Sequence, residues 1–300
     1  MINVNNTYTV SGHQMFLDEK DSLGLSTSIY ESHEMEVVKR EVHPGDVVLD
    51  IGANIGYYTL MFAKLVGNEG KVFAFEPEPE NFSLLKKNVE INGYQNVILI
   101  PKAISDKNDL IQLYLCESNK GMHRIYNSVC CNSSIEIESI RADDYFNSSH
   151  QINFIKIDIE GAEYAAIQGM QNILTQNRNI KIMTEFSPLA LFEYGIDPRD
   201  YINTLLKYDF TLFSIGENLE LIESEKLLSQ LTTLKVVLEQ FVTEEPDLKS
   251  RAYSIEKLVQ ILTDRLSENN YTRPLYENFL CVPKLNGLHS RSHSIRQNQS

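Results

Sequence analysis

Short apolar runs alternate with amphipathic stretches along most of the chain. The apolar runs have little internal polar alternation, which is typical of strands that helices cover on both faces. The stretches between them carry apolar residues at helical spacing, as Phe82, Leu85 and Val89 do. This alternation predicts an α/β fold with a parallel sheet and right-handed crossovers. The expected strands lie at residues 46–51, 71–76, 96–101, 153–159 and 180–186, and the expected helices at 57–65, 79–92, 162–174 and 198–208.

Residues 209–215 and 277–283 are expected to close the sheet as an antiparallel pair. Between them, residues 223–272 are rich in Leu, Glu, Lys and Gln at helix-like spacing, which predicts a helical insertion. The insertion could pack against the domain or against a second copy of the chain, giving a homo-oligomer, or it could cover the substrate as a lid. The main domain is therefore expected to comprise residues 46–222 together with 273–285.

The remaining segments are shorter and more polar. Residues 1–45 are expected to form a hairpin followed by a leading helix at 31–42. Segments 110–115 and 134–140 predict short strands in a polar excursion from the main alternation. Residues 286–300 are poor in apolar side chains, so they are expected to be disordered.

Composition narrows the classes of partner. The 300 residues contain 27 Lys and Arg against 41 Asp and Glu, a formal net charge of −14. Nucleic acids and anionic membranes are bound by clustered cations, so both are disfavoured as partners. The chain shows neither an apolar run long enough to span a bilayer nor the features of a signal peptide, so a cytoplasmic protein is expected. The four cysteines lack metal-ligand spacing, and no zinc site is predicted.

The clearest motif is DIGANIG at residues 50–56, a glycine-rich turn between an expected strand and an expected helix. Open α/β sheets bind nucleotides at such turns. A dinucleotide fingerprint has a glycine where Asn54 stands, because that glycine lets a pyrophosphate approach the backbone. Asn54 therefore favours a nucleoside without phosphate. Glu76 ends the next strand and is placed to accept both ribose hydroxyls, so the turn and the acid together predict an adenosyl ligand that carries an amino acid.

Four segments together resemble the FkbM family of methyltransferases: DVVLDIGANIGYYTLMFA, VFAFEPEPENFSLLKKNVEING, AISD at residues 103–106 and FIKIDIEGAE at 154–163. Many methyltransferases share the glycine-rich block, whereas its combination with KIDIEGAE is much more specific. The resemblance covers roughly residues 30–190. It implies a Rossmann-like, class I domain with seven strands, the last one antiparallel, and helices on both faces. It also implies S-adenosylmethionine as methyl donor and O-methylation of a hydroxyl on a sugar, a polyketide or another small metabolite. The long insertion departs from the usual short connection, which leaves the acceptor open.

Residue by residue, the resemblance implies that the glycine-rich turn lines the methionine end of the donor and that Glu76 holds the ribose. Ala103 and Ser105 would lie near the adenine, and Asp158 would face the methyl group and the acceptor. The expected cofactor-binding residues are Asp50, Gly52, Asn54, Gly56, Glu76, Ala103, Ser105 and Asp158.

Lys156, Asp158 and Glu160 alternate with isoleucines, so period two places all three on one face of a buried strand. Ionisable groups there are unfavourable unless they are paired or face a cleft. Methyl transfer to a hydroxyl needs alignment and removal of a proton, and the catalytic candidates are Asp158, Glu160 and, at the end of the next strand, Glu185. An ion pair of Lys156 with one carboxylate, beside Glu163 as a helix cap, is the structural alternative. Asp158 and Glu185 could hold magnesium, but without an obvious third ligand they do not predict a metal site.

Two other functions stay open at this stage. A nicotinamide-dependent dehydrogenase has the same fold but needs the pyrophosphate glycines, which are missing. A methyltransferase-like subunit without activity could bind a partner through residues 223–272, since a fold does not fix a function. His33 and His123 are further possible proton acceptors, and the pair at 143–144 favours a helix cap over catalysis.

Overall fold

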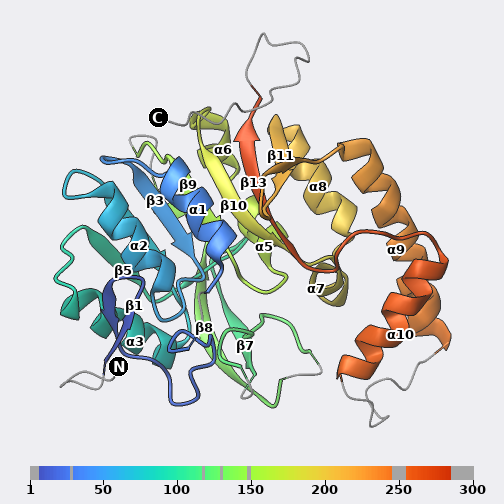
Figure 1. The fold of residues 1–300 in the computed structure, drawn as a ribbon, viewed down its shortest axis with the longest axis horizontal. Coiled ribbons are helices and arrows are strands. Elements are labelled where there is room, and N and C mark those ends of the chain that lie inside the picture. Colours follow the sequence, from blue (N-terminus) through green and yellow to red (C-terminus); the bar gives the residue numbers. More distant parts are fainter. Residues whose placement is uncertain are drawn as a thin grey trace.

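An eight-stranded sheet forms the centre of the molecule in the computed structural model, which describes residues 7–27, 30–116, 119–128, 131–146, 150–244 and 255–284 (Figure 1). The strands, from one edge to the other, are β12 (Glu220–Leu221), β11 (Phe210–Ser214), β13 (Glu277–Pro283), β10 (Lys181–Phe186), β9 (Phe154–Ile157), β3 (Val47–Ile51), β4 (Lys71–Phe75) and β5 (Val97–Ile100).

The strands from β10 to β5 run parallel, and β13 lies antiparallel to both β10 and β11. The predicted mostly parallel sheet with an antiparallel last strand is therefore confirmed, but it has eight strands where seven were predicted. The structure adds β12 as a two-residue edge strand beside β11. A strand of two residues is too short to leave a periodic signal in the sequence, which is why it was not predicted.

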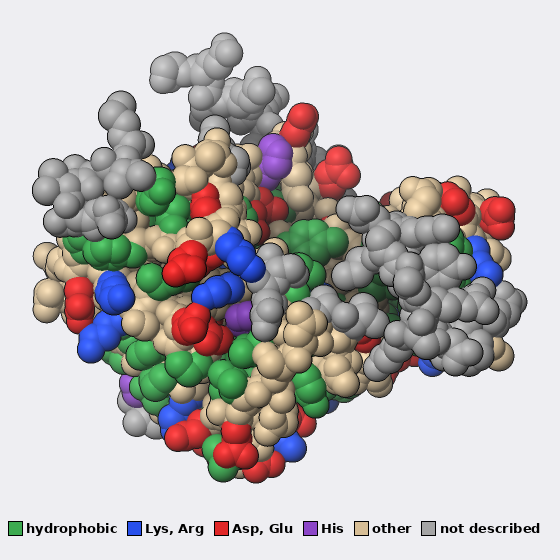
Figure 2. All heavy atoms as spheres, turned by 90° about the horizontal axis from the view of Figure 1, so that it is seen from below, with side chains coloured by type: hydrophobic (Ala, Val, Ile, Leu, Met, Phe, Trp, Pro, Cys, Tyr) green, Lys and Arg blue, Asp and Glu red, His purple; other side chains and the backbone are tan. Residues whose placement is uncertain are grey.

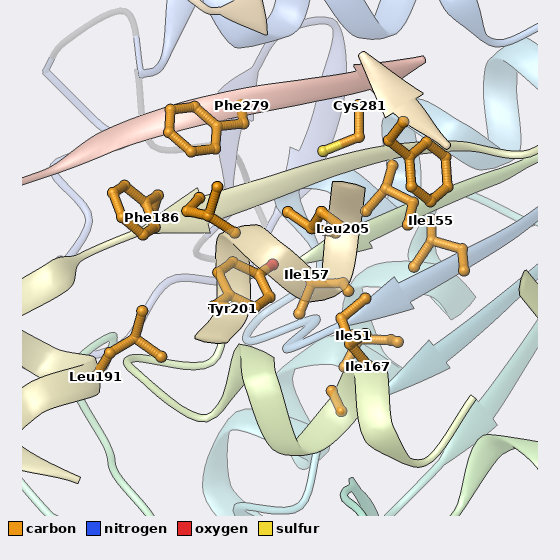
Figure 3. Close-up of a cluster of buried hydrophobic side chains, with 14 of the residues drawn as sticks. Ile51, Ile155, Ile157, Ile167, Phe186, Leu191, Tyr201, Leu205, Phe279 and Cys281 are labelled. Carbon is orange, nitrogen blue, oxygen red and sulfur yellow. The ribbon is translucent and has the colours of Figure 1, made fainter. Parts of the chain in front are cut away.

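Helices cover both faces of the sheet because alternate strand residues point in opposite directions. In β3, Val48 belongs to one core, whereas Leu49 and Ile51 belong to the other. Figure 3 shows the second core, where strand isoleucines and Phe279 gather beside Tyr201. The first core includes α1 (Ser32–Glu41), α2 (Tyr57–Val66) and α3 (Pro79–Ile91), and the second includes α5 (Glu163–Gln168), α6 (Gln171–Gln176), α7 (Pro188–Glu193) and α8 (Pro198–Lys207).

The single helix predicted at 162–174 is wrong, because the structure divides it into α5 and α6 around Gly169. A Cβ on Gly169 would lie 1.9 Å from the carbonyl oxygen of Ser105. The carboxylate of Asp143 then accepts the N–H groups of Asn172 and Ile173, each at 3.0 Å. This residue thus caps the start of α6 across a long sequence separation, whereas the short helix beside it in the sequence, at 142–145, has Arg141 as its N-cap.

Two small β units lie beside the main sheet. A hairpin of β1 (Tyr8–Val10) and β2 (His13–Met15) precedes α1, and Asn88 of α3 fixes its end by accepting the N–H of Phe16 at 2.6 Å. The strands expected in the polar excursion form a separate three-stranded sheet. It consists of β6 (Ala103–Ile104), β8 (Ser133–Ile140) and β7 (Asp109–Leu115), with the short helix α4 (Ala142–Tyr145) following β8.

The insertion contains two helices, α9 (Ser224–Glu244) and α10 (Ile255–Glu268), at one side of the domain (Figure 1). The buried leucines of α9, which include Leu227 and Leu231, belong to the second core. Lys235 of α9 also pairs with Asp197 at 2.9 Å. The insertion thus packs on the domain itself. Residues 286–300, expected to be disordered, lie outside the described residues. Within the described ranges, no helix has both the length and the apolar character of a membrane span.

We expect Gly169→Ala to destabilise the domain, because its new methyl group would meet the Ser105 carbonyl. Overpacking of this kind costs about 1–3 kcal/mol in free energy of unfolding, which urea denaturation would measure. Gly216→Ala is the matched control, since a Cβ there lies 3.8 Å from its nearest neighbour. Equal stabilities of the two variants would contradict the role of Gly169 as a packing position.

Candidate functional site

Two adjoining pockets open at the carboxyl ends of the parallel strands. The first, beside the glycine-rich turn, has a volume of about 610 Å³ and the second about 650 Å³, both including space open to solvent. Both are lined by Gly52, Asn54, Asp158 and Glu160, so the two pockets adjoin at these residues. Figure 2 views the molecule from this end, where acidic and basic side chains are interspersed with hydrophobic ones.

The turn after β3 has an unusual backbone that brings it against the end of β9. Gly52 has φ +83°, and a Cβ on it would lie 1.9 Å from the carbonyl oxygen of Asp158. Asn54 also has a positive φ, 49°, and its side-chain oxygen accepts the N–H of Ile55 at 2.7 Å. A short polar side chain that bonds locally stabilises this left-handed conformation. The asparagine in the motif therefore has a structural role as well as its place in the pocket wall.

Glu76, directly after β4, is fixed by two backbone groups. One carboxylate oxygen accepts the N–H of Asn54 at 2.8 Å, and the other accepts that of Glu78 at 2.9 Å. Burial raises the pKa of Glu76 to about 7, although these two hydrogen bonds act in the opposite direction. Each oxygen can still accept a further donor, as the hydroxyls of a ribose would require.

The sequence-predicted cofactor residues divide into two groups. Gly52, Asn54, Glu76, Ala103 and Asp158 line the first pocket, together with apolar side chains such as those of Phe75 and Leu113. Three predicted residues do not line either pocket. Asp50 is fully buried and accepts the hydroxyl of Thr59, Ser105 contacts Asp106, and Gly56 begins α2 against Leu85.

The charged residues around β9 form a connected group. Lys156 pairs with Asp158 at 2.8 Å and lies over the ring of Tyr58, 4.5 Å from its centroid. Burial alone would lower the pKa of Lys156, but the nearby carboxylates raise it, so the ammonium stays charged. Glu160, with φ 55°, lies 3.4 Å from Arg124. The ion pair of Lys156 with a carboxylate, which was the structural alternative, is thus present, and its carboxylate partner Asp158 also lines the pockets.

Two further carboxylates lie deeper. Glu163 accepts the N–H groups of Ile159 and Gly161, each at 3.1 Å, and so holds the loop that carries Glu160. Glu185, at the end of β10, is buried, and its Oε2 meets no hydrogen-bond donor within the described part of the chain. Burial, and then the neighbouring carboxylates, raise its pKa well above the ordinary value. One oxygen each of Asp158, Glu160 and Glu185 lie within 4.8 Å of one another.

Sequence reasoning missed the residues that complete the second pocket from distant segments. Glu31, at the start of α1, accepts the hydroxyl of Tyr58 at 2.5 Å and has a left-handed backbone, φ 44°. Burial, and then the charge of Asp158, raise its pKa. Tyr30 and Tyr276 line the same pocket from either end of the chain. In the sequence, the one signal that could have identified Glu31 as a site residue is its position at the start of a predicted helix.

The two candidate histidines differ. His33 is exposed on α1 and lines neither pocket. His123 lines the first pocket, and its Nδ1 accepts the N–H of Cys116 at 3.1 Å. Burial lowers the pKa of His123, which favours the neutral ring.

Comparison with known proteins places this geometry in a family. A family model described as the methyltransferase FkbM domain matches residues 50–212. Hexuronic acid methyltransferase AglP of Haloferax volcanii is 29% identical over 178 residues, which are 57% of this chain and 67% of that protein. Protein-L-isoaspartate O-methyltransferase 1 of Archaeoglobus fulgidus is 30% identical over 87 residues, 28% of this chain and 40% of that protein. A solved SAM-dependent O-methyltransferase of Thermotoga maritima has 14% identity and a TM-score of 0.42, covering 88% of this chain and 69% of that one.

The donor of this family, S-adenosylmethionine, fits the first pocket. A nucleoside requires an acceptor for its ribose and an apolar place for its base, and Glu76 and the side chains near Ala103 supply these. The backbone of Gly52 lies so close to Asp158 that no side chain fits at position 52, and the turn therefore has no side-chain bulk there. The methyltransferase relatives also favour this activity over the nicotinamide-dependent dehydrogenase.

We expect Glu76→Ala to weaken binding of S-adenosylhomocysteine, the donor product, by about 10–100-fold, the loss of one or two hydrogen bonds to a charged group. Isothermal calorimetry would measure the affinity, and circular dichroism would show that the variant is folded. Glu90→Ala is the control, because Glu90 lies on the exposed side of α3, 3.9 Å from Lys86. Unchanged affinity in a folded Glu76→Ala protein would remove the ribose assignment.

Proposed function

This chain belongs to the FkbM methyltransferase family, and from that premise we propose that it methylates a hydroxyl oxygen of a sugar or another small metabolite. The observation that carries the proposal is that the two pockets have a common wall, formed by Gly52, Asn54, Asp158 and Glu160. A donor in the first pocket would direct its methyl group toward an acceptor in the second.

A donor held beside Glu76 and the glycine-rich turn would supply a methyl carbon that its sulfonium activates. The acceptor's hydroxyl oxygen would form the new bond to that carbon as the carbon–sulfur bond breaks and leaves its electron pair on sulfur, and a carboxylate of the chain would take the hydroxyl proton. Asp158 is the proposed proton acceptor because it lines both pockets and because Lys156, 2.8 Å away, holds its carboxylate in place there. Glu160, which also lines both pockets, and the deeper Glu185 contribute to the electrostatic potential around Asp158. Alignment of the reactants supplies the rest of the acceleration.

The second pocket favours a neutral polyhydroxyl acceptor. Tyrosine rings and the Glu31 carboxylate give it both apolar surface and hydrogen-bonding groups, as sugars require. The relative AglP is named for a hexuronic acid, which carries a carboxylate. Here the lining contains Glu31, Asp158 and Glu160, whereas its cation Lys156 is already paired. These carboxylates would repel a carboxylate on the acceptor, so we infer that the acceptor of this chain is a hydroxyl of a neutral sugar.

The function is tested with a trideuteromethyl-labelled donor and a small-molecule extract of the cells from which the gene comes. We expect the purified protein to add one labelled methyl group to a neutral hydroxylated compound, detected by mass spectrometry. The label should resist mild alkali, because a methyl ether is stable where a methyl ester is cleaved. Label found only on nitrogen, or only as an alkali-labile ester, would contradict the proposal.

With that acceptor in hand, Asp158→Asn should lower kcat by about 100-fold or more, the range of a positioned general base. Its affinity for S-adenosylhomocysteine should change much less. A variant with nearly full kcat would show that Asp158 has a structural role alone.

Glu31→Gln should raise the KM for the acceptor and lower kcat/KM by about 10-fold, the effect of one hydrogen bond to a charged group. Glu36→Gln, on the exposed side of the same helix beside Lys39, is the matched control. If Glu31→Gln instead weakens donor-product binding and leaves the acceptor KM unchanged, Glu31 does not belong to the acceptor pocket.

A further inference from the structure

The carboxylates of Asp158, Glu160 and Glu185 converge from the ends of two neighbouring parallel strands, β9 and β10. One oxygen of each lies within 4.8 Å of the others. Metal–oxygen distances are about 2.1 Å for magnesium and about 2.4 Å for calcium, so two ligands of one ion are separated by at most roughly 4–5 Å. Three oxygens at this spacing can therefore bind a single divalent ion with little movement.

The partners of the three carboxylates are unequal. Asp158 has Lys156 at 2.8 Å, and Glu160 has Arg124 at 3.4 Å, which also pairs with Glu193 at 3.0 Å. Glu185 is 2% exposed, and its Oε2 has no hydrogen-bond donor among the described residues. A buried carboxylate without a partner is strongly unfavourable. The cluster thus contains one deeply buried carboxylate oxygen, Oε2 of Glu185, that no hydrogen-bond donor of the described residues reaches.

We propose that Asp158, Glu160 and Glu185 bind a divalent cation, with magnesium as the fitting ion. Hard cations of this kind take carboxylate oxygens as ligands, and magnesium characteristically keeps water or substrate oxygens in its other positions. Asp158 and Glu160 are in the wall that the donor and acceptor pockets share, so the open positions of the ion would be reachable from the pockets. The ion would also give the buried Oε2 of Glu185 a partner.

The catalytic role of the ion rests on the proposed function, although its binding does not. An acceptor hydroxyl oxygen bound to the cation would be held beside Asp158, and the cation's charge would make its proton easier to remove. The proton still passes to the carboxylate of Asp158, and the bonds made and broken at the methyl carbon are unchanged. A sugar with two adjacent hydroxyls would offer the ion two oxygens and so fix which one reacts.

The test titrates the full chain with Mn²⁺ in the absence of donor and acceptor, and follows the free ion by electron paramagnetic resonance. We expect one Mn²⁺ to bind per chain and Mg²⁺ to displace it. Glu185→Gln should weaken binding by about 100-fold or more, beyond the range of residues that act only on metal ligands. Asp158→Asn provides a second ligand variant if Glu185→Gln does not fold.

Glu163→Gln is the matched control, because it removes the same charge beside the cluster from a side chain that holds the backbone of Ile159 and Gly161. It should weaken Mn²⁺ binding by no more than about 10-fold. No binding at millimolar Mn²⁺ would overturn the proposal in favour of a proton shared by Glu185 and Asp158. Equal weakening by Glu163→Gln and Glu185→Gln would also overturn it, since that result indicates general attraction by charge. Calorimetry with S-adenosylhomocysteine on the same preparation separates failure of the metal site from failure of the methyltransferase assignment.

Discussion

The site depends on the close contact between the turn after β3 and the end of β9. The amide of Asp158 donates to the carbonyl of Ile51 at 3.1 Å, and its own carbonyl lies where a side chain at Gly52 would begin. On the other side, Gly52 and Ala53 both donate to the carbonyl of Phe75, at 3.1 and 3.0 Å. Backbone groups of β4 and β9 thus hold the turn between them. Every other feature of the two pockets follows from that arrangement, because it brings the ends of three strands together.

The same arrangement concentrates acidic groups where water is scarce. Burial raises the pKa values of Glu76, Glu160 and Glu163 to about 7. Lys156 and Arg124 compensate part of this charge through direct ion pairs. Such a concentration opposes stability, and proteins retain it at places where ligands bind. Each acid has a distinct task in our interpretation: Glu76 toward the donor, Glu31 toward the acceptor, and the three at the ends of β9 and β10 toward a cation and the reacting hydroxyl.

Particular elements show how far the sequence could lead. The buried strands and their helices were predictable because each has a strong local period, and the FkbM resemblance rested on segments that lie at the carboxyl ends of those strands. The helix at 162–174 failed because its break at Gly169 comes from the Ser105 carbonyl, sixty-odd positions away in sequence. Asp50 and Ser105 show that a match to a family motif does not by itself place a side chain in the site. Both belong to matching segments, yet their side chains contact Thr59 and Asp106 and do not line the pockets.

By itself, the sequence determined most of the order of strands and helices, the glycine-rich turn at residues 50–56, and the acid at the end of the second main strand. These features are local, since hydrophobic period, backbone freedom and spacing are properties of neighbouring residues. Only the tertiary structure decided that Glu31 and Tyr276 meet Asp158 across one pocket, and that the buried Oε2 of Glu185 has no donor among the residues that the structure describes. Burial and charge pairing depend on which distant segments come into contact, and no local pattern records those contacts.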